Sequence, residues 1–292
     1  MLVIIFMELT SPLMEVGLPG NLSAEKLEVL RRVSALILDV DGVLFEGQRM
    51  LPGAMELIAF LRKSKTPHIY LSNNTTFPLE HHIQKLSRLG SPVSPDSIIT
   101  AARITSKVLA KEAAPGTCCL MIGESGLREA LVEEGFEVTY SDYDRAKYVI
   151  IGMDRWLTYE KLKCASLAIR NGAEFISSNP DPTYPDGNQL LPASGAIQAA
   201  LEATTGVKAR VTGKPAIYGF LEALERLRTL PEQTAMLGDQ PEIDIQGGVN
   251  AGVRAFLVLS SLTPHYQPHN GYPQPEAVFK NTLDFYEHWL QR

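Results

Sequence analysis

Four short groups of polar residues follow or precede apolar stretches of this chain, and together they could perform chemistry on a charged substrate. The first group is Asp39 and Asp41, which follow the apolar run "ALIL" and precede a glycine. The other groups carry hydroxyl, amide, ammonium and carboxyl functions: Ser72, Asn73 and Asn74; Lys214; and Asp239 with Asp244. Each group alone is common in turns. Combined, they supply a nucleophile, a base, hydrogen-bond donors and a cation, which are the parts that phosphoryl transfer requires.

The residue types explain the chemistry. A carboxylate such as Asp39 can attack phosphorus and form an aspartyl-phosphate, which divides one difficult displacement into two easier ones. Because an anion that attacks an anion is repelled, the site also needs positive charge, from Mg²⁺ on oxygen ligands and from a lysine ammonium. Mg²⁺ is therefore the predicted cofactor. An EF-hand calcium loop beginning at Asp39 fails, because Val43 and Met50 occupy its fifth and twelfth positions.

The elements that must position these groups follow an α/β pattern, in which apolar strand-like runs alternate with helix-like segments. Strands are predicted over residues 35–39, 67–72, 147–152, 234–238 and 253–260, and helices over 158–171 and 216–228. Residues 179–192 hold four prolines and predict a long loop, and the tail from Leu262 predicts a surface excursion. His265 and His269 in that tail are more typical of solvated loop histidines than of a metal site. Open parallel sheets place ligands beyond the carboxyl ends of their strands, where these polar groups would meet.

Composition excludes several classes of protein. The chain has 292 residues, 45% of them hydrophobic, which is enough for one large domain or two modest ones. A formal net charge of −6 argues against a general nucleic-acid binder. Three cysteines without a C-x-x-C pair favour a reducing cytoplasm. The apolar opening "MLVIIFM" is too short for a signal peptide or a membrane span, so residues 1–20 are expected to form a loose leader and no membrane partner is expected.

Seven blocks, in order, resemble motifs of the haloacid dehalogenase superfamily. They are "DVDGVLFEG", "LSNNTT", "MIGESGLREALVEEGFEV", "GMDRWLTYEKL", "SSNPDPTYPDGNQLLPASGAI", "GKP" and "GDQPEIDIQGGVNAG". The chain looks like the class IIA subgroup, which contains 4-nitrophenylphosphatase, phosphoglycolate phosphatase and pyridoxal phosphate phosphatase, over roughly residues 34–260. The resemblance implies a Rossmann-like, doubly wound parallel-sheet core from residues 21–100 and 209–292. An α/β cap domain would be inserted over residues 101–208.

The resemblance also implies a role for each matching residue. Asp39 would be the nucleophile and a metal ligand. Asp41 would be the general acid and then the base, with its backbone carbonyl on the metal, and an acid at this position distinguishes phosphatases from dehalogenases. Lys214 would offset negative charge. The remaining expected roles are metal binding by Asp239 and Asp244 and phosphate binding by Gly42, Ser72, Asn73 and Asn74. Gln240 and Ile243 differ from the residues that are usual in relatives, and the resemblance implies that they lie in the surroundings of the metal.

In the expected cap, Asp154, Arg155 and Trp156 are candidates for contact with the leaving group, although an ordinary strand-to-helix loop would contain the same residue types. The implied function is a Mg²⁺-dependent phosphatase for small phosphomonoesters, with 4-nitrophenyl phosphate as a generic substrate. Phosphoglycolate, pyridoxal phosphate, nucleoside monophosphates and sugar phosphates are the physiological candidates. A non-catalytic phosphate-ligand sensor on the same fold and a phosphotransferase remain as alternatives. Relatives often dimerise through their caps, so a homodimer is a further expectation.

Overall fold

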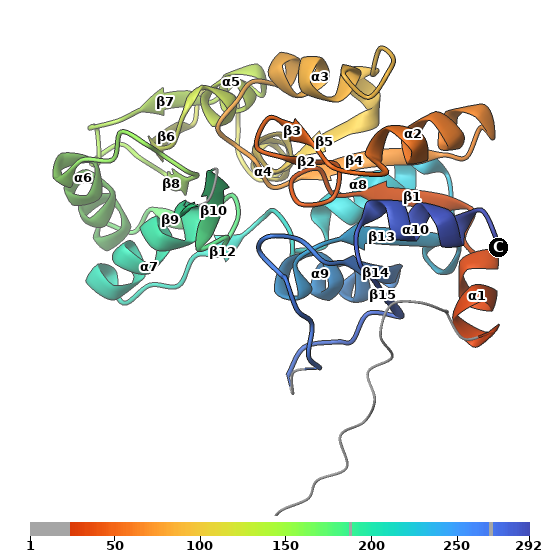
Figure 1. The fold of residues 1–292 in the computed structure, drawn as a ribbon. Coiled ribbons are helices and arrows are strands. Elements are labelled where there is room, and N and C mark those ends of the chain that lie inside the picture. Colours follow the sequence, from red (N-terminus) through yellow and green to blue (C-terminus); the bar gives the residue numbers. More distant parts are fainter. Residues whose placement is uncertain (1–23, 187–188, 269–270) are drawn as a thin grey trace, which may run out of the picture.

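Two parallel β-sheets organise the chain, and helices cover each of them (Figure 1). The structure is a computed structural model that describes residues 24–186, 189–268 and 271–292. The expected leader over residues 1–20 lies outside the described residues. The predicted α/β class, with parallel strands connected by helices, is confirmed.

The larger sheet has six strands in the order β15-β14-β13-β1-β4-β5, and every neighbouring pair is parallel. Its strands are β1 (Ala35–Leu38), β4 (His68–Ser72), β5 (Ile98–Thr100), β13 (Thr234–Gly238), β14 (Arg254–Val258) and β15 (Ala277–Phe279). Strands β4 and β5 lie on one side of β1, and β13, β14 and β15 lie on the other side. The strand order therefore reverses between β1 and β13, which is where a doubly wound sheet opens a crevice for ligands.

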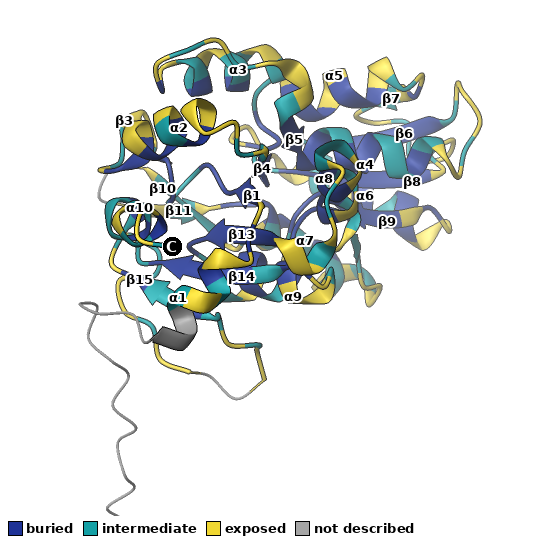
Figure 2. Ribbon diagram, turned by 90° about the vertical axis from the view of Figure 1, so that its right-hand side faces the viewer, coloured by how far each residue is buried: buried dark blue, intermediate teal, exposed yellow. Residues whose placement is uncertain are grey.

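Helices pack on both faces of this sheet, so its central strands are buried on both sides. All four residues of β1 are buried, and Leu36 and Leu38 pack into one hydrophobic cluster while Ile37 packs into another. This alternation follows the two-residue period of a strand. Figure 2 shows the central strands in dark blue between helices whose outer faces are yellow. The helices are α1 (Ala24–Arg31), α2 (Ala54–Lys63), α3 (Leu79–Ser87), α8 (Tyr218–Leu227), α9 (Gln246–Asn250) and α10 (Thr282–Trp289). A short hairpin, β2 (Phe45–Glu46) with β3 (Arg49–Met50), follows β1.

The second sheet has five parallel strands in the order β12-β9-β8-β6-β7. They are β6 (Cys118–Ile122), β7 (Glu137–Thr139), β8 (Tyr148–Ile151), β9 (Glu174–Ser177) and β12 (Arg210–Val211), and the helices beside them are α5 (Ser125–Glu133), α6 (Tyr159–Arg170) and α7 (Ser194–Thr205). We call the unit formed by residues 118–211 the cap; it lies beside the six-stranded unit in Figure 1.

Helix α4 (Ala101–Ala110) belongs to both units. Its Ala102 and Leu109 pack with the core of the cap, whereas Ile104 and Val108 pack with the core of the larger sheet. The predicted cap limits at residues 101 and 208 stay a prediction, since the first falls on this shared helix and β12 lies beyond the second.

Each predicted strand and helix corresponds to an observed one. The predicted loop over residues 179–192 is wrong in part, because β10 (Thr183–Asp186) and β11 (Gln189–Pro192) form an antiparallel hairpin there. Both strands of a two-stranded hairpin are edges, so Pro185 can lack an N–H without breaking a central ladder. In the described part of the tail, no helix or strand lies between β14 and β15, in agreement with a surface excursion. His265 is exposed, and His269 lies outside the described residues.

The aromatic cluster under α10 yields a stability prediction. Phe285 is fully buried, and its ring centroid lies 5.1 Å from that of Phe279 and 5.5 Å from that of Trp289. Phe285→Ala should lower the free energy of unfolding by about 3–5 kcal/mol, through lost burial and the cavity left behind. Urea unfolding followed by circular dichroism measures this change. Leu290→Ala, at a position that is 49% exposed beside the same helix, is the control and should change stability little. A similar loss in both variants would contradict the packing described.

Candidate active site

Three buried aspartates converge at the carboxyl ends of β1 and β13. Asp39 directly follows β1, and Asp239 directly follows β13, so the reversal in strand order brings them together. Asp244 is carried by a π-helical turn, Pro241–Ile245. One carboxylate oxygen from each of the three lies within 4.8 Å of the others. A Cβ on Gly238 would lie 2.2 Å from the Cβ of Asp244, so the glycine is what allows this turn to approach the strand.

Lys214 joins two of these acids. Its Nζ donates to Asp39 Oδ1 at 2.6 Å and to Asp244 Oδ1 at 2.6 Å, and all three side chains are buried. Burial alone would lower the pKa of Lys214, but the charges of Asp244 and Asp39 outweigh it and raise the pKa. The lysine therefore stays an ammonium ion at neutral pH.

One ammonium does not neutralise three carboxylates. Burial, opposed by Lys214 and assisted by Asp244, raises the pKa of Asp39 to about 8. Burial and the charge of Asp39 also raise the pKa of Asp239. Asp239 Oδ2 accepts a hydrogen bond from Ser260 Oγ at 2.6 Å, whereas its Oδ1 is buried without a partner. Excess negative charge and an unpartnered carboxylate oxygen fit a divalent cation with oxygen ligands.

Gly42 lies against this cluster and not in the lining of the cavity above it. Its φ is +93°, and a Cβ at this position would lie 2.0 Å from Asp239 Oδ2. The glycine makes room for the carboxylate of Asp239, and the phosphate contact of Gly42 stays a prediction.

A cavity of about 310 Å³ opens above the acids, between the larger sheet and the cap. Seven of the predicted catalytic and binding residues line it, namely Asp39, Asp41, Ser72, Asn73, Asn74, Arg155 and Lys214, and Gln240 and Ile243 line it too. Asp239 and Asp244 lie outside the lining. Ser72 Oγ accepts the Asn74 N–H at 3.1 Å, which leaves the serine O–H available to a ligand.

Asp154 does not line the cavity. Its carboxylate accepts hydrogen bonds from Lys161 Nζ at 2.6 Å and from the Trp156 backbone N–H at 2.9 Å, and it is almost fully buried. The Asp154 carboxylate orders the loop before α6, and its contact with substrate stays a prediction. Trp156 is 76% exposed and does not line the cavity either.

Asp41 has a partner that sequence reasoning missed. Its Oδ1 accepts a hydrogen bond from Lys85 Nζ at 2.7 Å, and its side chain is 37% exposed. Lys85 comes from α3, where nothing in the sequence distinguishes it from a solvated helix lysine. His82, one turn earlier, lines the same cavity, and its Nε2 is buried without a partner. Burial lowers the pKa of His82 to about 4, with Asp41 opposing and Lys85 assisting.

Asn73 connects the larger sheet, the cap and Lys214. Its Nδ2 donates to Asp181 Oδ1 at 3.2 Å and to the Lys214 carbonyl at 3.1 Å, and its Oδ1 accepts the Lys214 backbone N–H at 2.9 Å. The Asn73 carbonyl accepts a hydrogen bond from Asn179 Nδ2 at 2.8 Å. Asp181, which sequence reasoning also missed, lines the cavity, and burial raises its pKa to about 6. The amide of Asn73 thus positions other groups of the site.

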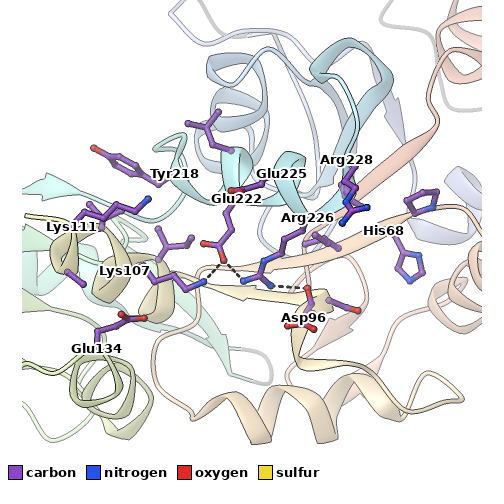
Figure 3. A pocket seen from close by; sticks show the side chains of 18 residues that line it. His68, Asp96, Lys107, Lys111, Glu134, Tyr218, Glu222, Glu225, Arg226 and Arg228 are labelled. Carbon is purple, nitrogen blue, oxygen red and sulfur yellow. Dashed lines mark hydrogen bonds and ion pairs between the residues drawn. The ribbon is translucent and has the colours of Figure 1, made fainter.

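A larger hollow, of about 1090 Å³, lies between α4, α8 and the edge of the larger sheet (Figure 3). Its central charges are satisfied by one another: Lys107 Nζ donates to Glu222 at 2.6 Å, and Arg226 donates to the Asp96 carbonyl at 2.9 Å and to Glu222. None of the three converging aspartates lines it. The chemistry therefore belongs to the smaller cavity.

The motifs and their geometry agree with known proteins. The family description "Haloacid dehalogenase-like hydrolase" matches residues 36–137, and a second one, HAD-hydrolase-like, matches residues 211–285. A protein named acid sugar phosphatase, from Staphylococcus aureus (strain USA300), is 34% identical over 252 residues, which cover 86% of this chain and 96% of that protein. The chain belongs to the haloacid dehalogenase-like hydrolases.

Solved structures place this haloacid dehalogenase-like hydrolase among phosphatases. A 4-nitrophenylphosphatase from Thermotoga maritima matches with a TM-score of 0.79 at 29% identity, covering 89% of this chain and 98% of that one. A glycerol phosphate phosphatase from Mycobacterium tuberculosis in complex with magnesium matches with a TM-score of 0.78 at 27% identity, covering 88% and 77%. The predicted family, its class IIA subgroup and the predicted enzyme class, a phosphoric monoester hydrolase, are confirmed.

The contact between Gly42 and Asp239 yields a prediction. Gly42→Ala must displace the Asp239 carboxylate, so it should weaken binding of a divalent cation by about 10- to 100-fold. Mg²⁺ titration followed by the rise in melting temperature measures the affinity. Gly90→Ala is the matched control, because Gly90 also has a positive φ, of +99°, but a Cβ added there would have no atom within 4 Å. Equal affinity in the two variants would contradict this role of Gly42.

Proposed function

We propose that this hydrolase is a Mg²⁺-dependent phosphatase that cleaves small phosphomonoesters through an aspartyl-phosphate on Asp39. The observation that supports it most directly is the convergence of Asp39, Asp239 and Asp244 around a single buried lysine, at the floor of a cavity. A purely structural cluster has no reason to bury three acids with one cation, because each uncompensated buried charge is costly.

The residues present fit Mg²⁺. Asp39 and Asp239 would hold the ion through their carboxylates and Asp41 through its backbone carbonyl, while Asp244 would act through water or by orienting the site. When bound, the ion supplies positive charge that offsets the approach of a carboxylate to a phosphate dianion. The relative in complex with magnesium supports this choice of cation.

The side chains divide the reaction between them. Asp39 attacks phosphorus, and the ester oxygen departs with a proton from Asp41. Asp41 then removes a proton from water, which attacks the aspartyl-phosphate, releases inorganic phosphate and restores Asp39. Lys214 favours the ionised form of Asp39 through their 2.6 Å contact and so opposes the effect of burial. Ser72 donates to a phosphate oxygen, and Lys85 holds Asp41 at the edge of the cavity.

The proposed substrates are small, because the cavity encloses only about 310 Å³. The names of the relatives refer to sugar phosphate, glycerol phosphate and nitrophenyl phosphate as substrates. We also propose a cytoplasmic location, supported by three free, buried cysteines. Among the described residues, no helix combines the length and apolar character needed to cross a bilayer. A homodimer through the cap stays a prediction.

Asp39→Asn should reduce hydrolysis of 4-nitrophenyl phosphate to the level of buffer, because a carboxamide cannot form the acyl phosphate. Release of 4-nitrophenolate and of inorganic phosphate, with Mg²⁺ present and after chelation by EDTA, gives the readout. Asp142→Asn, at a partly exposed position in the cap that pairs with Arg145, is the control and should retain full activity. Turnover by Asp39→Asn, or undiminished turnover in EDTA, would contradict the proposal.

The same assay separates the two alternatives. A sensor would raise its melting temperature with phosphate compounds while releasing no product. A phosphotransferase would yield a new phosphoester when an acceptor alcohol is added. Free phosphate equal to the 4-nitrophenolate released is the outcome expected of the phosphatase.

Metal binding should depend on pH. The pKa of Asp39 is 3.8 in an unfolded chain and about 8 in the folded, metal-free protein, so the folded state binds more protons between these values. Stability of the metal-free protein should therefore fall as the pH rises from about 4 to about 8, and Mg²⁺ should compete better with protons over the same range. The rise in melting temperature on adding Mg²⁺ is expected to be larger at pH 8 than at pH 6. An equal or smaller rise at pH 8 would be evidence against this carboxylate as a ligand.

A further inference from the structure

Among the described residues, every lysine and arginine that lines the active-site cavity is already ion-paired. Lys214 pairs with Asp39 and Asp244, and Lys85 pairs with Asp41. The remaining cation is Arg155, which comes from the cap. It lines the cavity from the cap, whereas Asp39 and Asp41 line it from the loop that follows β1 of the larger sheet.

Arg155 is held by Glu124 in a two-pronged ion pair. Its Nε donates to Glu124 Oε1 at 2.8 Å and its terminal nitrogen donates to Oε2 at 2.6 Å, while the Arg155 backbone N–H donates to Oε1 at 3.0 Å. The Glu124 side chain is only 12% exposed. Although burial favours the neutral acid, the hydrogen bonds from Arg155 hold the pKa of Glu124 below its usual value. The positive charge of Arg155 is thus compensated before a substrate arrives.

The pair lies where the cap meets the larger sheet. The Arg155 guanidinium lies 5.4 Å from the ring centroid of Phe77, and Phe77 stacks on His81 with centroids 4.2 Å apart. Phe77 and His81 line the same cavity and come from the segment after β4. Arg155 is therefore held by the Glu124 carboxylate of the cap and by the Phe77 ring of the larger unit.

The remaining ionisable groups that line the cavity do not add positive charge. Burial and the charge of Lys85 lower the pKa of His81, and His82 is likewise biased toward its neutral form. The cap contributes two further carboxyl groups to the lining, Asp181 and Asp186. A second negative charge on a substrate would meet carboxylates without finding a free cation.

We propose that the Glu124–Arg155 pair selects substrates by charge, so that the enzyme prefers phosphomonoesters of neutral, hydroxylated alcohols over those whose alcohol carries a carboxylate. This inference rests on the proposed phosphatase function and narrows its substrate class. A carboxylate in the leaving group must either compete with Glu124 for Arg155 or remain unpaired beside Asp181 and Asp186, and both arrangements are unfavourable.

A matched pair of substrates tests the inference. 2-Hydroxyethyl phosphate and phosphoglycolate have the same chain length and differ in a hydroxymethyl against a carboxylate. Their kcat/KM values are measured by phosphate release, and their inhibition constants are measured against 4-nitrophenyl phosphate. The wild-type enzyme should prefer 2-hydroxyethyl phosphate by about tenfold or more, the size of one charge-assisted hydrogen bond.

Two variants should move this ratio in opposite directions. Glu124→Gln keeps the shape of the side chain but frees the charge of Arg155, so phosphoglycolate should gain about tenfold relative to 2-hydroxyethyl phosphate. Arg155→Met leaves the negative charge of Glu124 uncompensated. The kcat/KM for phosphoglycolate should therefore fall further relative to that for 2-hydroxyethyl phosphate. Glu133→Gln, on α5 and paired only loosely with Arg103 at 3.5 Å, is the control and should leave the ratio unchanged.

A wild-type preference for phosphoglycolate, or the same ratio in all three variants as in the wild type, would overturn the inference. Either result would leave the proposed function intact if 4-nitrophenyl phosphate is still hydrolysed. Absence of hydrolysis with every phosphomonoester would instead refute the proposed function, and the inference with it. Adding Arg155→Met to Glu124→Gln should abolish the gain, and a gain that persists would show that it does not act through Arg155.

Discussion

The site depends on the burial of three carboxylates around one ammonium ion. Each of these acids would be more stable in water, and their mutual repulsion adds to the cost of burying them. Lys214 offsets part of that cost by contacting two of the acids at once, and the third retains an unpartnered oxygen. The protein therefore keeps a fixed deficit of positive charge at the proposed binding site for a cation and a phosphate. Such a deficit raises carboxyl pKa values and would contribute to the affinity for the divalent cation of the proposed function.

The topology of the sheet brings these acids together. Asp39 and Asp239 need only follow adjacent parallel strands, since the reversal in strand order leaves no helix over the gap between them. Two glycines then allow close approach: Gly42 beside Asp239, and Gly238 beside Asp244. A side chain at either position would push a carboxylate away, so these glycines determine where the carboxylates lie.

Much of the core of the site could be predicted from the sequence, because it depends on local patterns. Asp39 and Asp239 directly follow apolar strands, and this pattern can be recognised in the sequence without any knowledge of tertiary structure. Contacts between distant segments could not be predicted in this way. Lys85 reaches Asp41 across the gap between α3 and the loop after β1, and Glu124 reaches Arg155 between two loops of the cap. Asp154 and Arg155 are adjacent in sequence, yet one orders a loop and the other lines the cavity. The hairpin β10–β11 could not be predicted, because prolines are typical of loops. The hairpin tolerates its prolines because it has no third strand that would need their missing N–H groups.

Helix α4 lies at the junction of the two units, with one face in each hydrophobic core. Thr105 on this helix also bonds to Thr212, at 2.7 Å, just after the last strand of the cap. Rotation of the cap against the larger sheet must therefore slide apolar side chains past one another on at least one side of α4. Helix α4 therefore connects the two units rigidly. Side chains on a helix that contributes nothing to the lining of the active-site cavity thus help to fix the cap against the larger sheet.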